Sequence, residues 1–182
     1  MRQRLSFRVA LCGVLAALMA AILLLGTMIP GTTYLCPALA GAFLIPVLWE
    51  LGIKAGLLVY GVVSLLSLLL TPDKEAALFF VLLFGWYPLL RPRLQHLKKK
   101  PLRGMVKFLL FNLSLLVIAL LTVFVLGLPL VEEGGPVGPA ILMAGFLILG
   151  NVSFLLYDIL LGRLSNLYVL RLRPKLFPRR LS

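Results

Sequence analysis

The sequence predicts an all-α membrane protein, a bundle of six transmembrane helices with both termini on the cytoplasmic side. Of its 182 residues, 62% are hydrophobic, compared with about 45–50% in soluble domains. The mean hydropathy is +1.09. Six apolar runs are long enough, or nearly so, to cross a bilayer. Most basic residues lie between these runs, as expected of a membrane protein oriented by its charges.

The six predicted spans are residues 9–29, 33–49, 53–70, 76–90, 105–128 and 139–161. With the N-terminus inside, every Lys and Arg except Lys74 falls on the cytoplasmic side, in agreement with the positive-inside bias. Removing or adding one span would move a heavy basic block to the outer face. The net charge of +12 is therefore expected to meet anionic membrane lipid and not nucleic acid. Since no linker divides the chain, residues 1–182 are expected to form one domain.

The first run follows a basic N-terminus, as a secretory signal does, but it has the length of a full span and no small-x-small cleavage site closes it. Small residues recur within it at four-residue spacing in two overlapping registers. These are Ala16 with Ala20, and Gly13 with Ala17 and Ala21. Small residues at this spacing allow a second helix to approach closely in lipid. That helix could belong to a partner protein or to the same bundle.

The second and fourth runs are the shortest. Pro37 and Pro46 in the second run and Pro88 in the fourth predict kinks or tilted entry into the membrane. Glu50 and Lys54 flank the turn between the second and third runs, where they are expected to pair with each other.

The third run has a polar stripe on one helical face, which leads from mid-membrane to the following outer loop. The stripe consists of Tyr60, Ser64, Ser67 and Thr71. It could line a solute pocket. Alternatively, the hydroxyls bond to the preceding helical turn while the tyrosine packs in the core.

The loop after this stripe contains an acid, a base and a second acid in succession. These are Asp73, Lys74 and Glu75, and Lys74 is the basic residue predicted to lie outside. We therefore expect these three residues at the rim of a solute pocket, with Tyr60 and Asn151 deeper. The alternative is helix-start chemistry, in which Asp73 and Glu75 complement the positive N-terminal end of the fourth span.

The last span carries Asn151 and Asp158 on one face, because seven residues are nearly two helical turns. An ionisable group inside a membrane is by default a functional-site hypothesis. Tyr87 and Asn112 are predicted at a depth similar to that of Asp158, so these residues could form a buried polar cluster. The structural interpretation is favoured, in which Asp158 pairs with Arg163 or with a residue of the basic stretch 91–107.

Motifs for soluble-type catalysis are missing from the sequence. No span offers a His together with a Ser or Cys, and no HExxH motif or phosphate-binding loop occurs. His96 has no second ligand nearby in the sequence, and Cys12 and Cys36 are predicted at opposite ends of the first hairpin, too far apart for a disulfide. We therefore expect no enzyme activity, cofactor, metal site or disulfide.

In size, number of spans, basic N-terminus and cytoplasmic ends, the whole chain resembles the S components of energy-coupling factor (ECF) transporters. These are the substrate-binding membrane subunits of vitamin and micronutrient uptake in prokaryotes. In that family an Ala-x-x-x-Ala pattern on the first span docks against the transmembrane coupling subunit, and Ala16-x-x-x-Ala20 or Ala17-x-x-x-Ala21 matches it. The segment 70–88, with its Phe-Gly-Trp-Tyr-Pro ending, also looks like membrane proteins of this type.

The resemblance implies a passive solute-capturing subunit in the plasma membrane of a prokaryote. Its partners would be a transmembrane coupling subunit, two ATP-hydrolysing subunits and a small-molecule substrate that enters a pocket from outside. Because ligand residues differ between S components, the resemblance assigns none here. The alternative is a membrane scaffold, similar in size to the rod-shape protein of the cell-wall elongation machinery. A hydrated cavity beneath the outer ends of the third and fifth spans would favour the transporter subunit, and a close-packed bundle the scaffold.

Overall fold

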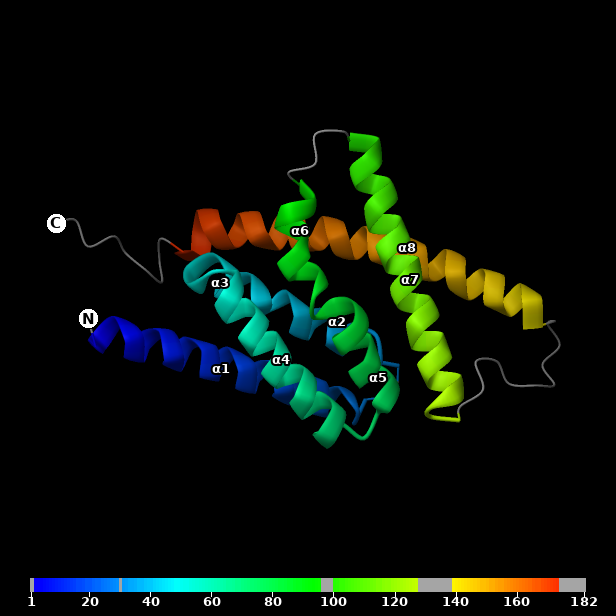
Figure 1. The fold of residues 1–182 in the computed structure, drawn as a ribbon, viewed down its shortest axis with the longest axis horizontal. Helices are drawn as coiled ribbons and strands as arrows, with labels where there is room; N and C mark the ends of the chain where they lie inside the picture. The colour runs from blue at the N-terminus through cyan, green and yellow to red at the C-terminus, as the bar shows by residue number, and fades with distance from the viewer. Residues whose placement is uncertain (1, 30, 96–99, 128–138, 174–182) are drawn as a thin grey trace.

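The computed structural model describes residues 2–29, 31–95, 100–127 and 139–173, and its regular elements there are all helical (Figure 1). They are α1 (Arg2–Gly26), α2 (Leu35–Ala42), α3 (Leu44–Leu51), α4 (Ile53–Leu70), α5 (Lys74–Phe79), η1 (Phe80–Phe84), α6 (Tyr87–Gln95), α7 (Lys100–Phe124), α8 (Pro139–Leu167) and η2 (Tyr168–Leu172). The segments η1 and η2 are short π-helices. The predicted all-α class is confirmed.

Within the described residues, five helical segments are long and apolar enough to cross a membrane. They are Arg8–Gly26, Ile53–Leu70, Lys74–Gln95, Pro101–Phe124 and Met143–Arg171. A multi-pass membrane protein is therefore supported by length and composition. The second predicted span, 33–49, is not one continuous helix. It consists of the two eight-residue helices α2 and α3, which together cover Leu35–Leu51.

Proline explains why the second predicted span is broken. Pro46 has no backbone N–H to donate to the carbonyl of Ala42, so a continuous helix would lose a bond at this point. The chain bends instead at Phe43, whose N–H bonds to the carbonyl of Ala40 at 3.1 Å. Pro46 then lies in the first turn of α3, where a missing N–H costs nothing. Pro37 has the same position in α2.

The fourth span, predicted as 76–90, is one irregular rod made of α5, η1 and α6. Its middle is widened, because the N–H of Gly85 bonds to the carbonyl of Phe80, five residues back, at 2.7 Å. Pro88 follows at the second position of α6. The predicted irregularity at Pro88 is thus present, and it takes the form of a π-helical turn that precedes the proline.

The core has two packed regions. In the first, Met19 and Leu23 of α1 are almost fully buried against residues of α2, α3, α4 and η1. In the second, aromatic side chains of α6, α7 and α8 pack together, with the Phe111 and Phe154 rings stacked at 4.5 Å. The helix α2 contacts α1, α5, η1 and α8 and so lies at the centre of the bundle.

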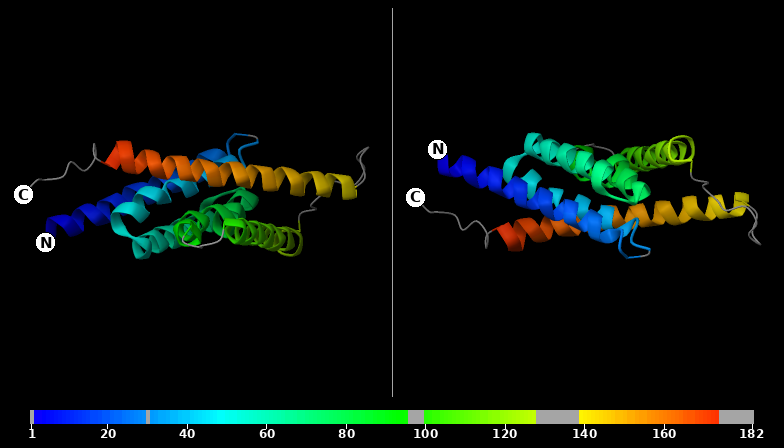
Figure 2. Two further views of the ribbon diagram at one scale, coloured as in Figure 1. Left: turned by 90° about the horizontal axis from the view of Figure 1, so that it is seen from above. Right: turned by 90° about the horizontal axis from the view of Figure 1, so that it is seen from below.

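The long helices enclose this centre. The helix α8 runs along one side of the bundle and α4 and α7 along the other (Figure 2). The beginning of α1 and the end of α8 lie at the same end of the molecule, as a topology with both termini on one side of a membrane requires (Figures 1 and 2). Which side of the membrane that is stays a prediction.

One predicted contact is wrong. Glu50, at the end of α3, does not pair with Lys54 among the described contacts. Its Oε1 instead accepts from Arg173 Nε at 2.9 Å and from the Tyr168 hydroxyl at 3.2 Å. The reason is topological, since the end of α8 and η2 return to the position where α3 ends.

Candidate functional site

The residues predicted at the pocket rim form a hydrogen-bonded cluster with the loop between α1 and α2. Asp73 caps α5, because its Oδ1 accepts from the N–H of Ala76 at 3.0 Å. Its Oδ2 accepts from the Thr33 hydroxyl at 3.0 Å, and Glu75 Oε1 accepts from the Tyr34 hydroxyl at 3.1 Å. We call Thr33, Tyr34, Asp73, Lys74 and Glu75 the rim cluster. Helix-start chemistry is therefore confirmed for Asp73.

Tyr34 is the anchor of the rim cluster. Its ring meets the Phe79 ring edge-on at 4.8 Å between centroids. Partial burial, and next the charge and hydrogen bond of Glu75, raise the pKa of Tyr34 to about 12. The phenol therefore stays protonated and donates. Lys74 points back along its own chain, and its Nζ donates to the carbonyl of Leu68 at 2.9 Å. Whether a solute replaces these internal contacts stays a prediction.

The polar stripe of α4 faces into the bundle. Ser67 and Thr71 are almost fully buried, and the Ser67 hydroxyl donates to the carbonyl of Ser64 in the preceding turn at 2.9 Å. The Ser64 and Thr71 hydroxyl oxygens are buried without a hydrogen-bond partner among the described residues. The bonded Ser67 fits the packing interpretation. The hydroxyls of Ser64 and Thr71, on the same face, could still form hydrogen bonds.

Tyr60 supports the irregular fourth span. Its hydroxyl donates to the carbonyl of Val81 at 2.7 Å, one of the carbonyls that the π-helical turn leaves open. A Cβ at Gly85 would overlap the Tyr60 ring, so glycine is what lets the ring come this close. Trp86 Nε1 donates to a second open carbonyl, that of Leu82, at 2.5 Å. The geometry assigns Tyr60 a structural contact; its role in solute binding stays a prediction.

The helices α7 and α8 are joined by a pair of asparagines. Asn112 Nδ2 donates to Asn151 Oδ1 at 3.0 Å, and Asn151 Nδ2 donates to Asn112 Oδ1 at 3.3 Å. Each Nδ2 also donates to a carbonyl one turn back on its own helix. Both amides are thus largely satisfied, as polar groups within lipid must be. The predicted cluster of Tyr87, Asn112 and Asp158 is therefore divided, since Asn112 joins Asn151 and not Asp158.

Asp158 is the centre of the second group, contributed by three helices. Its Oδ1 accepts from the Tyr87 hydroxyl at 2.7 Å and from Arg91 Nε at 2.8 Å. Its Oδ2 accepts from Lys107 Nζ at 2.6 Å. We call Tyr87, Arg91, Lys107 and Asp158 the ionic cluster. The expectation that Asp158 pairs with the basic stretch 91–107 is confirmed, and Arg163 is not among its partners.

Arg91 and Lys107 were predicted as part of the basic stretch 91–107 but not as individual partners of Asp158. The sequence contains a signal for both. Lys107 lies within an apolar run, where a cation needs a partner. Arg91 follows Tyr87 by four residues and so lies on the same face of α6. What the sequence does not contain is the crossing of α6, α7 and α8 that brings both cations to one carboxylate.

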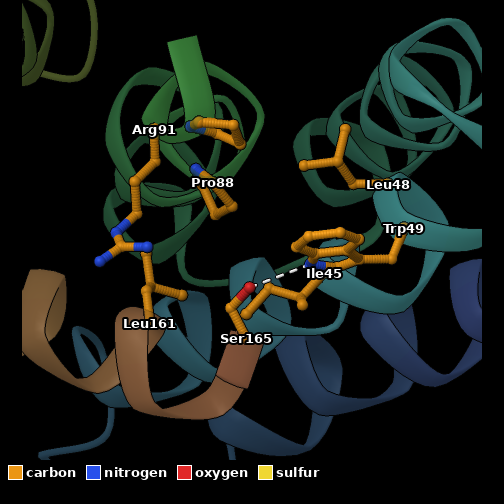
Figure 3. A pocket seen from close by; sticks show the side chains of 8 residues that line it. Ile45, Leu48, Trp49, Pro88, Arg91, Leu161 and Ser165 are labelled. Carbon is orange, nitrogen blue, oxygen red and sulfur yellow. Dashed lines mark hydrogen bonds between the residues drawn. The ribbon is translucent and has the colours of Figure 1, made fainter. Parts of the chain in front are cut away.

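Two cavities adjoin the ionic cluster. The smaller, of about 20 Å³, lies between α3, α6 and α8, where Trp49 Nε1 donates to the Ser165 hydroxyl at 2.9 Å (Figure 3). It has room for about one water. The larger, of about 210 Å³, lies between α7 and α8. Its lining residues are Arg103, Gly104, Lys107, Phe108, Asn151, Phe154, Leu155 and Asp158. We call it the α7–α8 cavity.

Of the five residues predicted to bind solute, Asn151 lines the α7–α8 cavity and the other four line neither cavity. The described cavities thus lie beside the basic ends of the helices and not beneath the rim cluster.

The predicted partner face of α1 divides into two parts. Gly13, Ala17 and Ala21 are exposed, and a Cβ at Gly13 would meet nothing within 4 Å. Ala16 and Ala20 are half-buried, and Ala16 packs against the core region that contains Met19 and Leu23. One register therefore serves packing inside the bundle, and the other faces outward.

No group of described His, Cys, Asp and Glu residues is arranged to hold a metal ion, and His96 lies outside the described residues. No family model, curated protein or solved structure matches this chain. The resemblance to ECF S components therefore rests on the sequence features alone.

Proposed function

We propose that the protein is the substrate-binding membrane subunit of an ECF-type uptake transporter for a vitamin or related micronutrient. The observation that carries the proposal is the outward-facing row of Gly13, Ala17 and Ala21 on α1. The opposite face of α1 is packed on the bundle, so this row leaves a smooth strip on which a helix of a coupling subunit can lie closely.

The rim cluster supplies the proposed entry for solute. It joins the start of α5 to the loop after α1 through two side-chain hydrogen bonds. Because both bonds involve exposed or half-buried groups, a polar solute can replace them at small cost. The buried hydroxyls of Ser64 and Thr71, which have no hydrogen-bond partner within the described part of the chain, would then be available beneath the rim.

A membrane scaffold is the second candidate, and a specific observation favours it. The two described cavities lie away from the rim cluster, and the α4 face below the rim is closely packed. A scaffold needs no solute pocket, and the same outward row on α1 would serve a different partner protein.

Purification of the tagged chain after co-expression with a coupling subunit and two ATP-hydrolysing subunits tests the proposal. We expect all three to co-purify, and Ala17→Leu to reduce their recovery at least tenfold, because a leucine prevents close helix approach. Ala144→Leu is the matched control, since Ala144 is exposed on α8, away from this row. Mass spectrometry of the purified complex should detect a retained small molecule.

Two results would contradict this function. Equal recovery of the partners by Ala17→Leu and Ala144→Leu would remove the docking face. Co-purification of cell-envelope proteins without any small molecule would favour the scaffold.

A further inference from the structure

The α7–α8 cavity holds more positive than negative charge. Its lining includes Arg103 and Lys107 but one acid, Asp158. That carboxylate is shared between Lys107 and Arg91, so it is already outnumbered. Arg103 is half-buried and has no acidic partner among the described residues. A half-buried arginine without an acidic partner among the described residues, next to a second cation, provides an electrostatic site for an anion.

The walls of the cavity indicate where that anion comes from. Phe108 and Leu155 line it, and these residues are 57% and 62% exposed on the outer faces of α7 and α8. Since both helices are long and apolar enough to span a membrane, these exposed faces meet lipid chains. The cavity therefore combines a cationic interior with an apolar edge that is continuous with the membrane. A molecule with an anionic head and hydrocarbon tails satisfies both parts.

We propose that the α7–α8 cavity binds the phosphate of an anionic phospholipid headgroup, with Arg103 as its principal contact. The planar guanidinium presents several N–H donors in a fixed geometry that matches phosphate oxygens. Lys107 adds a second positive charge at close range while it remains bonded to Asp158. The volume of about 210 Å³ is far above the roughly 10–15 Å³ that one water requires on this measure.

The chemistry of the site favours an anionic phospholipid over a zwitterionic lipid and over a soluble anion. A zwitterionic headgroup places an ammonium or choline cation near Arg103 and loses much of the electrostatic gain. A soluble anion gains nothing from the apolar edge formed by Phe108 and Leu155. The site involves neither the α1 row nor the rim cluster, and of the residues predicted to bind solute it includes Asn151 alone.

Native mass spectrometry of the full chain, released from detergent after addition of phosphatidylglycerol, tests the site. We expect wild-type protein to retain phosphatidylglycerol in preference to phosphatidylcholine. Arg103→Gln should retain at least tenfold less. Arg93→Gln is the control, because Arg93 is an exposed basic residue of α6 that does not line the cavity. Millimolar inorganic phosphate should leave the bound lipid in place.

A second variant tests the cavity without a change of charge. Gly104 lines the cavity, and a Cβ there would meet nothing within 4 Å. Gly104→Leu should therefore fold normally, fill the cavity and reduce retention of phosphatidylglycerol. Equal retention by wild type, Arg103→Gln and Gly104→Leu would overturn the site and indicate nonspecific surface lipid. Equal retention of the two lipids, or displacement by inorganic phosphate, would also overturn an anionic phospholipid as the ligand.

Discussion

Asp158 of α8 joins three helices through its contacts with side chains of α6 and α7. A lone carboxylate within a membrane is costly, but this one accepts hydrogen bonds from a phenol, a guanidinium and an ammonium on α6 and α7. The side chains of Arg91, Lys107 and Asp158 are only 14%, 12% and 21% exposed. The two cations depend on the carboxylate at least as much as it depends on them, because they have no other acid among the described residues.

Asp158→Asn should therefore strongly destabilise the protein. It leaves two partly buried cations without a carboxylate, for which the cost is about 3–5 kcal/mol. The measurement is the unfolding temperature in detergent. Glu50→Gln is the control, because it leaves one cation unpaired, Arg173, whose side chain is 48% exposed, although Glu50 itself is 14% exposed; the expected loss is therefore smaller.

Adding Lys107→Met to Asp158→Asn should recover part of the loss, since one of the two unpaired cations is then removed. If Asp158→Asn lowers the unfolding temperature no more than Glu50→Gln does, the ionic cluster does not hold the helices together.

At the scale of elements, the irregular segment η1 is in close contact with side chains and backbone from other parts of the chain. The π-helical turn of η1 leaves carbonyls open, and Tyr60 and Trp86 donate to two of them. Pro88 cannot donate to the carbonyl of Phe84, and α2 passes directly beside that carbonyl at Gly41. A Cβ at Gly41 would overlap the Phe84 oxygen, so glycine is required for this crossing.

Gly41→Ala should destabilise the protein by about 1–3 kcal/mol, because the new methyl group must push apart α2 and η1, which have little space to move. Gly61→Ala provides the matched control. Gly61 lies in α4, where a Cβ would meet nothing within 4 Å, so alanine should be neutral or slightly stabilising. Thermal unfolding of both variants in the same detergent checks the difference. Equal unfolding temperatures would show that α2 and η1 can separate without cost.

The sequence predicts these elements only in part. Pro46 and Pro88 indicate that the second and fourth spans are irregular, since proline removes a backbone donor. They do not determine whether the chain bends, breaks or widens. That outcome depends on partners far along the chain, such as Tyr60 for η1, and on how closely Gly41 approaches. The depth of Asp158 was predictable by counting residues along α8, whereas its two cations required the tertiary crossing.

At the scale of the whole molecule, the rim cluster and the ionic cluster lie at different ends of the rod formed by α5, η1 and α6. The rim cluster surrounds the start of α5, and the ionic cluster includes Tyr87 and Arg91 of α6. The distribution of basic residues along the sequence, with Lys74 apart from the others, predicts that the rim faces outward and the α7–α8 cavity faces the cytoplasmic leaflet.

We predict that the rod of α5, η1 and α6 spans the membrane with its α5 end outside. Labelling of single cysteines by a membrane-impermeant maleimide in intact cells tests it most directly. Cys12 and Cys36 are first replaced by alanine, and Lys74→Cys and Arg93→Cys are then compared. We predict that the cysteine at 74 reacts in intact cells and that the cysteine at 93 reacts only after the membrane is permeabilised. Reaction of both from the same side, or the reverse order, would contradict the orientation on which the rim and the lipid site depend.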